Sequence, residues 1–244
     1  MQHRTRRSFV KGKELPKEHL EQIIACSKQG SSWMNGQQYS IIVATGDTKQ
    51  KIADLIKDKA PGNAAHIESS AAFLIYCIDF SNIKLSFDIE GGDFDISNQY
   101  EPLLIGSMDV GIAMQNAALA AESLGYGIVY CGGVRGFAKG ISELLNIPEN
   151  ALFLCGLSIG VIDEEKSTEK VKPRLPHEAN VGYNEFPKSN EEVLKQYRQT
   201  MIDFAEARET KTWTKKFADF YAQPSGIEKV TKELLEKKGF VNNR

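Results

Sequence analysis

Two short cationic stretches contain the residue types and spacings in this chain that could do chemistry. The first is "KPRLP" at 172–176, in which two cations alternate with two prolines. Because proline fixes its own φ and pushes the preceding residue towards extended geometry, this stretch is predicted to be stiff and extended. Residues two apart in an extended chain point to the same side, so Lys172 and Arg174 are expected to lie side by side. Two neighbouring cations on a rigid backbone predict a bound anion.

The second stretch is the N-terminal "HRTRRSF", in which His3, Thr5 and Arg7 alternate. If the segment is extended, an imidazole, a hydroxyl and a guanidinium share one side, a set that suits a phosphate or a carboxylate. The alternative for this stretch is a solvated basic tail, and the alternative for "KPRLP" is a stiff surface loop. Two such sets in a chain of net charge −2 favour a shared anion.

A glycine turn, "CGGVRG" at 131–136, follows an apolar run and would let the backbone approach a ligand closely, although a plain tight turn explains it too. The spacing is not that of the GxGxxG fingerprint, and the chain has no GxxxxGK[ST] or GxSxG motif. The four histidines show no metal-ligand spacing. Without an acid–base pair or a nucleophile, the profile predicts chemistry that belongs to a bound cofactor.

The elements that must position these residues follow from hydrophobic patterning. Helices are predicted over 16–29, 47–59, 107–125 and 137–146, and strands over 41–44, 71–80 and 151–161, with a further short strand before the glycine turn. The segment 81–106 is expected to be an irregular excursion, and the chain after Pro187 to be mostly helical, with Trp213, Phe217 and Phe220 on one packing face. Strands and helices without a regular βαβ alternation favour an α+β fold.

Composition limits the classes of function that this chain can have. A chain of 244 residues with balanced charge offers no field that indicates nucleic acid or an acidic membrane, and no apolar run reads as a membrane span or signal peptide. The four cysteines lack paired spacing, and Cys77 and Cys155 lie in apolar runs, which favours reduced thiols. We therefore expect a cytoplasmic protein that binds neither nucleic acid nor membrane.

Four segments resemble a known family. They are "HRTRRSF", "SSWMNGQQYSIIV", "AMQNAALAAESLGYGIVYCGGVRG" and "LSIGV" with "KPRLP" downstream. Together, in this order, they are similar to the FMN-dependent nitroreductase family, and to its larger flavin reductase and NADPH nitroreductase branch. A glutamine that touches FMN in that branch falls at Ala64, with Asn63 beside it.

The resemblance implies a homodimer with an antiparallel-rich mixed sheet wrapped by helices, and one nitroreductase-like FMN-binding domain over 1–244 whose helical C-terminal extension begins near 188. It places Arg7 near N1 and O2 of the flavin, the backbone N–H of Gly132 at N5, and Lys172 and Arg174 at the phosphate. The residues expected to contact FMN are His3, Arg4, Thr5, Arg7, Ser31, Ser32, Asn35, Cys131, Gly132, Gly133, Lys172 and Arg174.

The resulting hypothesis is an FMN-dependent NAD(P)H oxidoreductase that passes hydride through flavin N5 to nitro compounds, quinones or free flavins, or another small aromatic or quinone-like acceptor, by a ping-pong mechanism. No catalytic side chain is assigned, because the flavin does the chemistry. One rival is a flavin-binding protein of the same fold that stores or senses FMN; another is an interaction domain with a basic tail. The apolar segment 107–125 is expected in or under the dimer interface, and the choice between NADH and NADPH is left open.

Overall fold

The computed structural model describes residues 3–204 and 210–241 and divides the chain into two compact units. The smaller unit contains residues 1–4 and 168–225, and the larger one contains residues 5–167 and 226–244. The prediction that 1–244 forms one FMN-binding domain stays a prediction.

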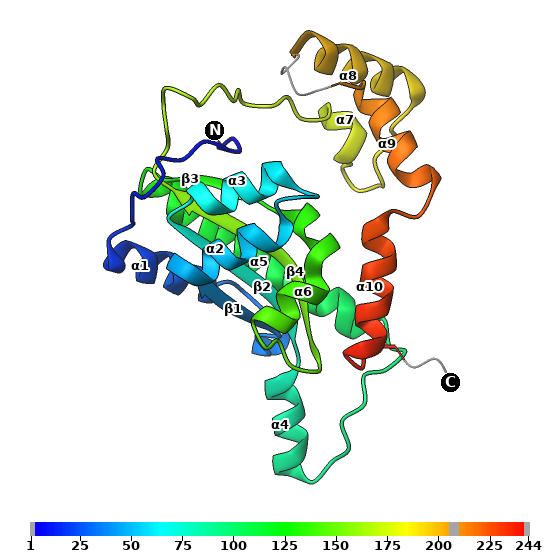
Figure 1. Ribbon diagram of the computed structural model, residues 1–244. Coiled ribbons are helices and arrows are strands. Elements are labelled where there is room, and N and C mark those ends of the chain that lie inside the picture. The colour runs from blue at the N-terminus through cyan, green and yellow to red at the C-terminus, as the bar shows by residue number, and fades with distance from the viewer. Residues whose placement is uncertain (1–2, 205–209, 242–244) are drawn as a thin grey trace. The chain divides into compact units, whose positions relative to one another are not determined.

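A four-stranded sheet forms the centre of the larger unit (Figure 1), with the order β1-β2-β4-β3. Its strands are β1 (Tyr39–Ala44), β2 (Ala72–Asp79), β3 (Gly127–Tyr130) and β4 (Ala151–Gly160). All three pairings are antiparallel. The central strands β2 and β4 are buried along almost their whole length, as their continuous apolar runs predict. With helices on the sheet, the α+β fold is confirmed.

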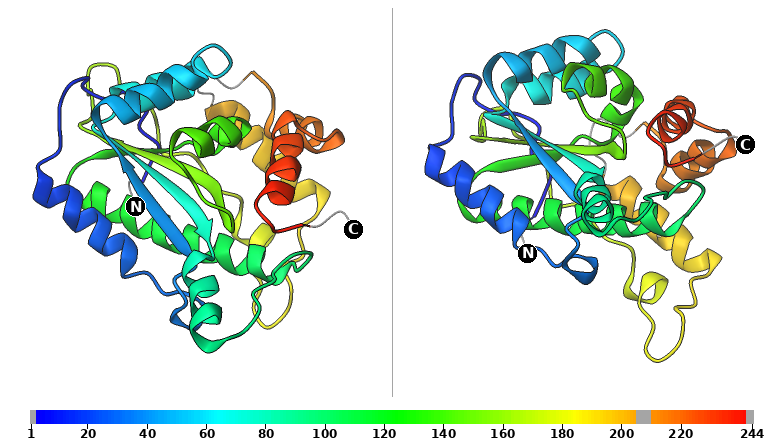
Figure 2. Two further views of the ribbon diagram at one scale, coloured as in Figure 1. Left: turned by 60° about the horizontal axis from the view of Figure 1, so that its bottom comes forward. Right: turned by 90° about the horizontal axis from the view of Figure 1, so that it is seen from below.

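Helices cover both faces of this sheet (Figure 2). On one face lie α1 (Lys17–Lys28) and α5 (Glu101–Ser123), and α5 contacts all four strands. On the other face lie α2 (Gly46–Ile56), α3 (Pro61–Ser69) and α6 (Ala138–Leu144). The small residues Ala113, Ala117 and Ala121 let α5 pack closely on the sheet.

The segment expected to be irregular is largely helical, so that prediction was wrong. Residues 81–90 form α4 (Ser81–Glu90), which ends at Gly91 in the left-handed conformation (φ 72°), and α5 starts at Glu101 rather than near 107. No residue of α4 is buried, so its sequence shows no core-facing stripe that could have revealed it. The helix α3 was also missed, because only Ala64, Ala65 and Ile67 of its nine residues are hydrophobic.

The helix α5 corrects a second expectation. By length and composition alone it is apolar enough to cross a membrane, whereas no such run was expected. Its face towards the sheet is buried, and Val110 and Ala118 have no exposed surface. The opposite face leaves Leu104, Met108 and Leu119 exposed in the single chain.

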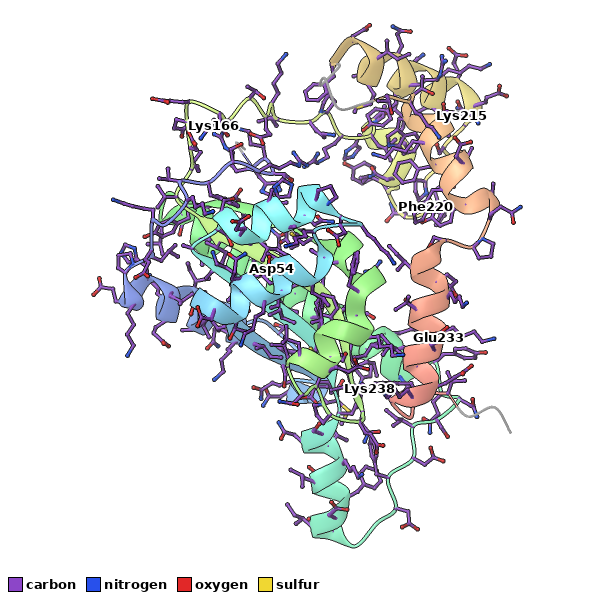
Figure 3. All side chains as sticks on the ribbon, in the orientation of Figure 1. Asp54, Lys166, Lys215, Phe220, Glu233 and Lys238 are labelled. Carbon is purple, nitrogen blue, oxygen red and sulfur yellow. The ribbon has the colours of Figure 1, made fainter. Side chains whose placement is uncertain are left out.

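The last helix, α10 (Gly226–Lys237), belongs to the larger unit and contacts α6 and the glycine turn. Lys238 follows it and is labelled in Figure 3; its ammonium donates to the carbonyl oxygens of Ile147 and Pro148. Burial lowers the pKa of Lys238. This buried lysine fastens the end of the chain to the loop before β4.

The smaller unit is built from α7 (His177–Asn180), α8 (Glu191–Phe204) and α9 (Trp213–Ala222). The Asn190 side chain accepts the N–H of Val193 and so caps α8, and Thr212 accepts the N–H of Lys215 at the start of α9. The rings of Trp213 and Phe217 lie 5.0 Å apart, as the predicted packing face requires. Phe220 instead packs on Tyr221 and is half exposed, so it does not complete that face.

Candidate functional site

The N-terminal segment runs along the edge of the sheet. The N–H of Arg6 donates to the carbonyl of Ile128 (2.8 Å), and Phe9 forms a bridge with Ile162. The guanidinium of Arg6 donates to the Ser167 hydroxyl at 2.7 Å. Because side chains alternate along an extended chain, Thr5 and Arg7 point to the side opposite Arg6. The expected extended geometry of this stretch is therefore present in the larger unit.

Arg7 is held in place through its main chain. Its carbonyl oxygen lies 3.0 Å from Nδ1 of His66 on α3, and because a carbonyl can only accept, this nitrogen must carry the proton. The positive charge of Arg7 acts on the Cys131 thiol. Burial raises the pKa of that thiol to about 12, and a hydrogen bond with Ser158 and the Arg7 charge oppose the rise. The charge of Arg7 thus acts on Cys131, the residue that precedes the glycine turn.

The glycine turn is a short 3₁₀ segment, η2 (Gly132–Phe137), that follows β3 directly. A Cβ placed on Gly132 would meet only the Cys155 sulfur, at 4.0 Å, and one on Gly133 would meet Nδ2 of Asn63 at 3.3 Å. The main chain at Gly132 is therefore open to a flat ligand. Ala64 is buried in the core, whereas the amide of Asn63 lies against the turn, so Asn63 is the polar group on α3 at this position.

The loop that contains Ser31, Ser32 and Asn35 lies on α5. Residues 33–35 form a 3₁₀ turn, η1 (Trp33–Asn35), and the Ser32 hydroxyl accepts the N–H of Gln37 at 3.2 Å. The carboxylate of Asp109 on α5 accepts the N–H of Trp33 (3.0 Å) and that of Gln38 (3.2 Å). The neighbours of this loop are residues of α5, while those of the glycine turn are Asn63, Cys155 and α10, so the two groups occupy different parts of the larger unit.

In the smaller unit, Lys172 and Arg174 line one pocket of about 560 Å³. Lys211 and Lys216 add two cations, and Tyr197, Trp213 and Phe217 form an aromatic wall. None of the described residues that line the pocket is acidic. Tyr197 donates its hydroxyl to the carbonyl of Pro173 (3.1 Å), which fixes the stretch. The expectation that Lys172 and Arg174 lie side by side is met, in a setting that favours an anion with an aromatic part.

The division into units separates the predicted residues into two groups. His3, Arg4, Lys172 and Arg174 belong to the smaller unit, and Thr5, Arg7, Ser31, Ser32, Asn35, Cys131, Gly132 and Gly133 belong to the larger one. Sequence reasoning missed two residues that hold these groups, His66 and Asp109. A signal for Asp109 was present, because a carboxylate stands inside an otherwise mostly apolar stretch of the predicted helix, next to Val110.

Two family profiles match most of the chain. The nitroreductase family profile matches residues 1–161, and the profile of its C-terminal domain matches residues 172–243. The chain is 36% identical to a Cr(VI) reductase of a Pseudomonas species, over 94% of this chain and 92% of that protein. It is 34% identical to an FMN reductase (NAD(P)H) of Bacillus subtilis, over 98% of this chain and 94% of that protein.

Among solved structures, the fold superposes on the NADPH:FMN oxidoreductase of Vibrio harveyi complexed with NAD⁺. The TM-score is 0.84 at 32% identity, over 99% of this chain and 96% of that one. The resemblance drawn from the four sequence segments is thereby confirmed. The chain belongs to the nitroreductase family.

Proposed function

We propose that this chain oxidises NAD(P)H and passes the hydride, through FMN, to a small flat acceptor such as a nitro compound, a quinone or a free flavin. It is an FMN-dependent NAD(P)H oxidoreductase by family. The observation that carries the proposal is the open main chain at Gly132, next to Cys131, whose thiol is influenced by the positive charge of Arg7. A glycine turn without side chains, under the influence of a positive charge, suits a planar ring with an electron-rich edge.

The residues present fit FMN. The pocket lined by Lys172 and Arg174 supplies cations for a phosphate, and its described lining adds no carboxylate to oppose one. In the larger unit, Gly132 and Gly133 leave space where a Cβ would have only Cys155 or Asn63 as neighbours. When bound, FMN supplies the capacity to accept and return a hydride. The chain's part is to bind, to orient and to stabilise charge.

We assign roles on this basis. Lys172 and Arg174 hold the phosphate, and His3, Arg4 and Thr5 add polar contacts. Arg7 stabilises negative charge that develops at the N1 and O2 side of the ring, and the N–H of Gly132, flanked by Cys131 and Gly133, orients the N5 side. Ser31, Ser32 and Asn35 contact the ring or the ribityl chain.

We further propose a homodimer with α5 in or under its interface. Leu104, Met108 and Leu119 are spaced along the outer face of α5 and are exposed in the single chain, as are Trp33 and Met34 beside it. Leu104 exposes 64% and Leu119 53% of its surface. Several large apolar side chains exposed on one helix are typical of an interface. Light scattering that shows a monomer fully loaded with FMN would contradict this assembly.

The function is tested by the visible spectrum of the purified protein and by turnover. We expect a yellow protein with about one releasable FMN per chain, and NAD(P)H oxidation that depends on an added acceptor. A protein that binds FMN but does not oxidise NAD(P)H would favour storage or sensing of FMN. A colourless protein that takes up no added FMN would favour an interaction domain. Comparison of NADH with NADPH decides the donor, and a cytoplasmic location stays a prediction.

A further inference from the structure

Asp109 ties both ends of one loop to a single carboxylate. It is 1% exposed on α5, and its two oxygens accept the N–H of Trp33 at 3.0 Å and the N–H of Gln38 at 3.2 Å. These amides are five residues apart and lie at the start and the end of the turn that follows Ser31 and Ser32. One buried side chain therefore closes the loop across its base.

The loop between the two amides has a costly backbone. Met34 (φ 51°), Asn35 (φ 58°) and Gln37 (φ 48°) adopt left-handed conformations although each has a Cβ. Such conformations persist only where surrounding contacts impose them. Inside the loop, the N–H of Gly36 donates to the carbonyl of Trp33 and the N–H of Gln37 to the Ser32 hydroxyl. Both of these bonds are local. From outside the loop, the N–H of Asp79 donates to the carbonyl of Gln38 at 3.1 Å, and Asp109 is the side chain that accepts an N–H at each end of the loop.

The loop faces outward from its support. Met34 exposes 87% of its surface and Asn35 is also exposed. Beneath it, a Cβ on Gly30 would lie 3.0 Å from the Ile112 side chain, and Asn116 donates to the carbonyl of Cys26 at 3.3 Å. The helix α5 therefore holds the backbone, while the side chains of the loop remain free to meet a ligand.

The residue type matches this task. A carboxylate offers two acceptor oxygens and no donor, so it can satisfy two N–H groups at once. An asparagine offers one oxygen, and its NH₂ group would face the second N–H without a bond. A buried carboxylate is also costly unless it accepts such bonds, which means that the helix and the loop stabilise each other.

We propose that Asp109 is a positioning residue that fixes the 31–38 loop in the conformation that presents Ser31, Ser32 and Asn35 to FMN. The presenting role rests on the proposed function, whereas the tie between helix and loop does not. Asp109 does not itself contact the cofactor in this assignment. It acts through the two backbone amides.

The test compares Asp109→Asn with Asp79→Asn. The carboxylate of Asp79 also accepts a backbone N–H, that of Ser81 at 2.8 Å, together with the Ser40 hydroxyl, so its loss is chemically matched but falls on the end of β2. Amide hydrogen exchange on the FMN-free protein reads the tie directly. We expect exchange at Trp33 and Gln38 to accelerate on the order of ten- to a hundredfold in Asp109→Asn. We expect no such change at Trp33 in Asp79→Asn. This control is read at Trp33 because the N–H of Asp79 itself donates to the carbonyl of Gln38.

A second readout uses Trp33 itself. The chain has two tryptophans, so the Trp213→Phe background leaves Trp33 as the sole indole. In this background Asp109→Asn should lower the fluorescence anisotropy of Trp33 in the FMN-free protein. In the chain that keeps Trp213, Asp109→Asn should lower FMN affinity about tenfold. Asp109→Glu keeps both carboxylate oxygens but moves them by one methylene, so its loss of FMN affinity should be smaller than that of Asp109→Asn.

The outcomes distinguish the tie between α5 and the loop from the positioning of that loop for FMN. Unchanged exchange at Trp33 and Gln38 in Asp109→Asn would overturn the tie. Faster exchange with unchanged FMN affinity and an unchanged flavin spectrum would overturn the positioning role and leave the proposed function intact. A natural chain that takes up no FMN would overturn the proposed function, and the presenting role with it, whatever the exchange shows. If Asp109→Asn does not fold, the same measurements on Asp109→Glu decide.

Discussion

Nδ1 of His66 holds the main-chain carbonyl of Arg7 at a distance of 3.0 Å. This contact links α3 to the N-terminal segment, 59 residues earlier in the chain. It fixes the backbone that carries the Arg7 guanidinium, which we place at the electron-rich edge of the flavin. We therefore propose that His66 affects cofactor binding through the position of Arg7.

His66→Ala should weaken FMN binding by roughly two- to tenfold, the value of one neutral hydrogen bond. The control is His19→Ala, because Nδ1 of His19 likewise takes part in a hydrogen bond, with the Tyr126 hydroxyl at 2.6 Å. Both affinities can be measured by quenching of FMN fluorescence. Equal FMN affinities in the two variants would show that the His66 contact does not serve the cofactor.

Arg174→Ala should weaken FMN binding on the order of ten- to a hundredfold, since a hydrogen bond to a charged group contributes about 1.5–3 kcal/mol. The variant should also lose much of the preference for FMN over riboflavin, because only FMN carries the phosphate. Lys195→Ala is a matched control, since Lys195 pairs with Glu191 on the surface of α8 outside the pocket. Arg174→Ala with natural FMN affinity would refute the phosphate assignment.

Gly132→Ala should slow reduction by NAD(P)H more than it weakens FMN binding. The added Cβ has only the Cys155 sulfur near it, at 4.0 Å, so the fold should accept it and the loss should report on the ligand side. Gly132→Val should have a larger effect. Stopped-flow bleaching of the flavin under anaerobic conditions measures this step.

Gly226→Ala is the control for that experiment, because a Cβ there meets nothing within 4 Å. It should leave both the rate of reduction and FMN affinity unchanged. If NAD(P)H reduces the flavin of the FMN-saturated Gly132 variants as fast as that of the natural protein, the orienting role of Gly132 is wrong.

NAD(P)H and the acceptor should use one open pocket in turn, because the chain carries no second nucleotide fingerprint. The oxidised donor must then leave before the acceptor enters, and double-reciprocal plots at several acceptor concentrations should be parallel. Intersecting lines, or a complex that holds both substrates, would require a second site.

Stability should fall at alkaline pH, in part through Cys77. Burial raises the pKa of this thiol to about 12, from 9.0. Below pH 9 the thiol is neutral in the folded and unfolded states, and its stabilising effect is complete. Above pH 9 only the unfolded state loses the proton, so stability is lost until the pH passes the folded pKa.

For this one thiol, the free energy of unfolding should fall by about 1.4 kcal/mol between pH 7 and pH 10. Urea titrations of the natural chain and of Cys77→Ala at pH 7 and at pH 10 measure how much the free energy of unfolding of each protein changes with pH. The variant is expected to be less stable at pH 7 but less sensitive to alkali. Parallel pH dependence in the two proteins would contradict the assignment.

The sequence by itself determined the elements whose patterns are local. The apolar runs of β2 and β4 and the small, apolar residues of α5 predict their own burial, because each must exclude water along its length. Four ordered motifs indicated the family, and the prolines around Arg174 predicted the geometry that lets it share a pocket with Lys172. These predictions depend on residues within a few positions of one another.

Only the tertiary structure decided which distant residues meet. Asp109 reaches an amide 76 residues away in sequence, and His66 reaches a carbonyl 59 residues away. Neither contact has a local pattern, because the packing of α5 and α3 on the sheet creates it. The helix α4 escaped prediction for the opposite reason: it buries no residue, so no hydrophobic period marks it. Periodicity predicts elements that bury a face, whereas the contacts that hold a site depend on where folded elements cross.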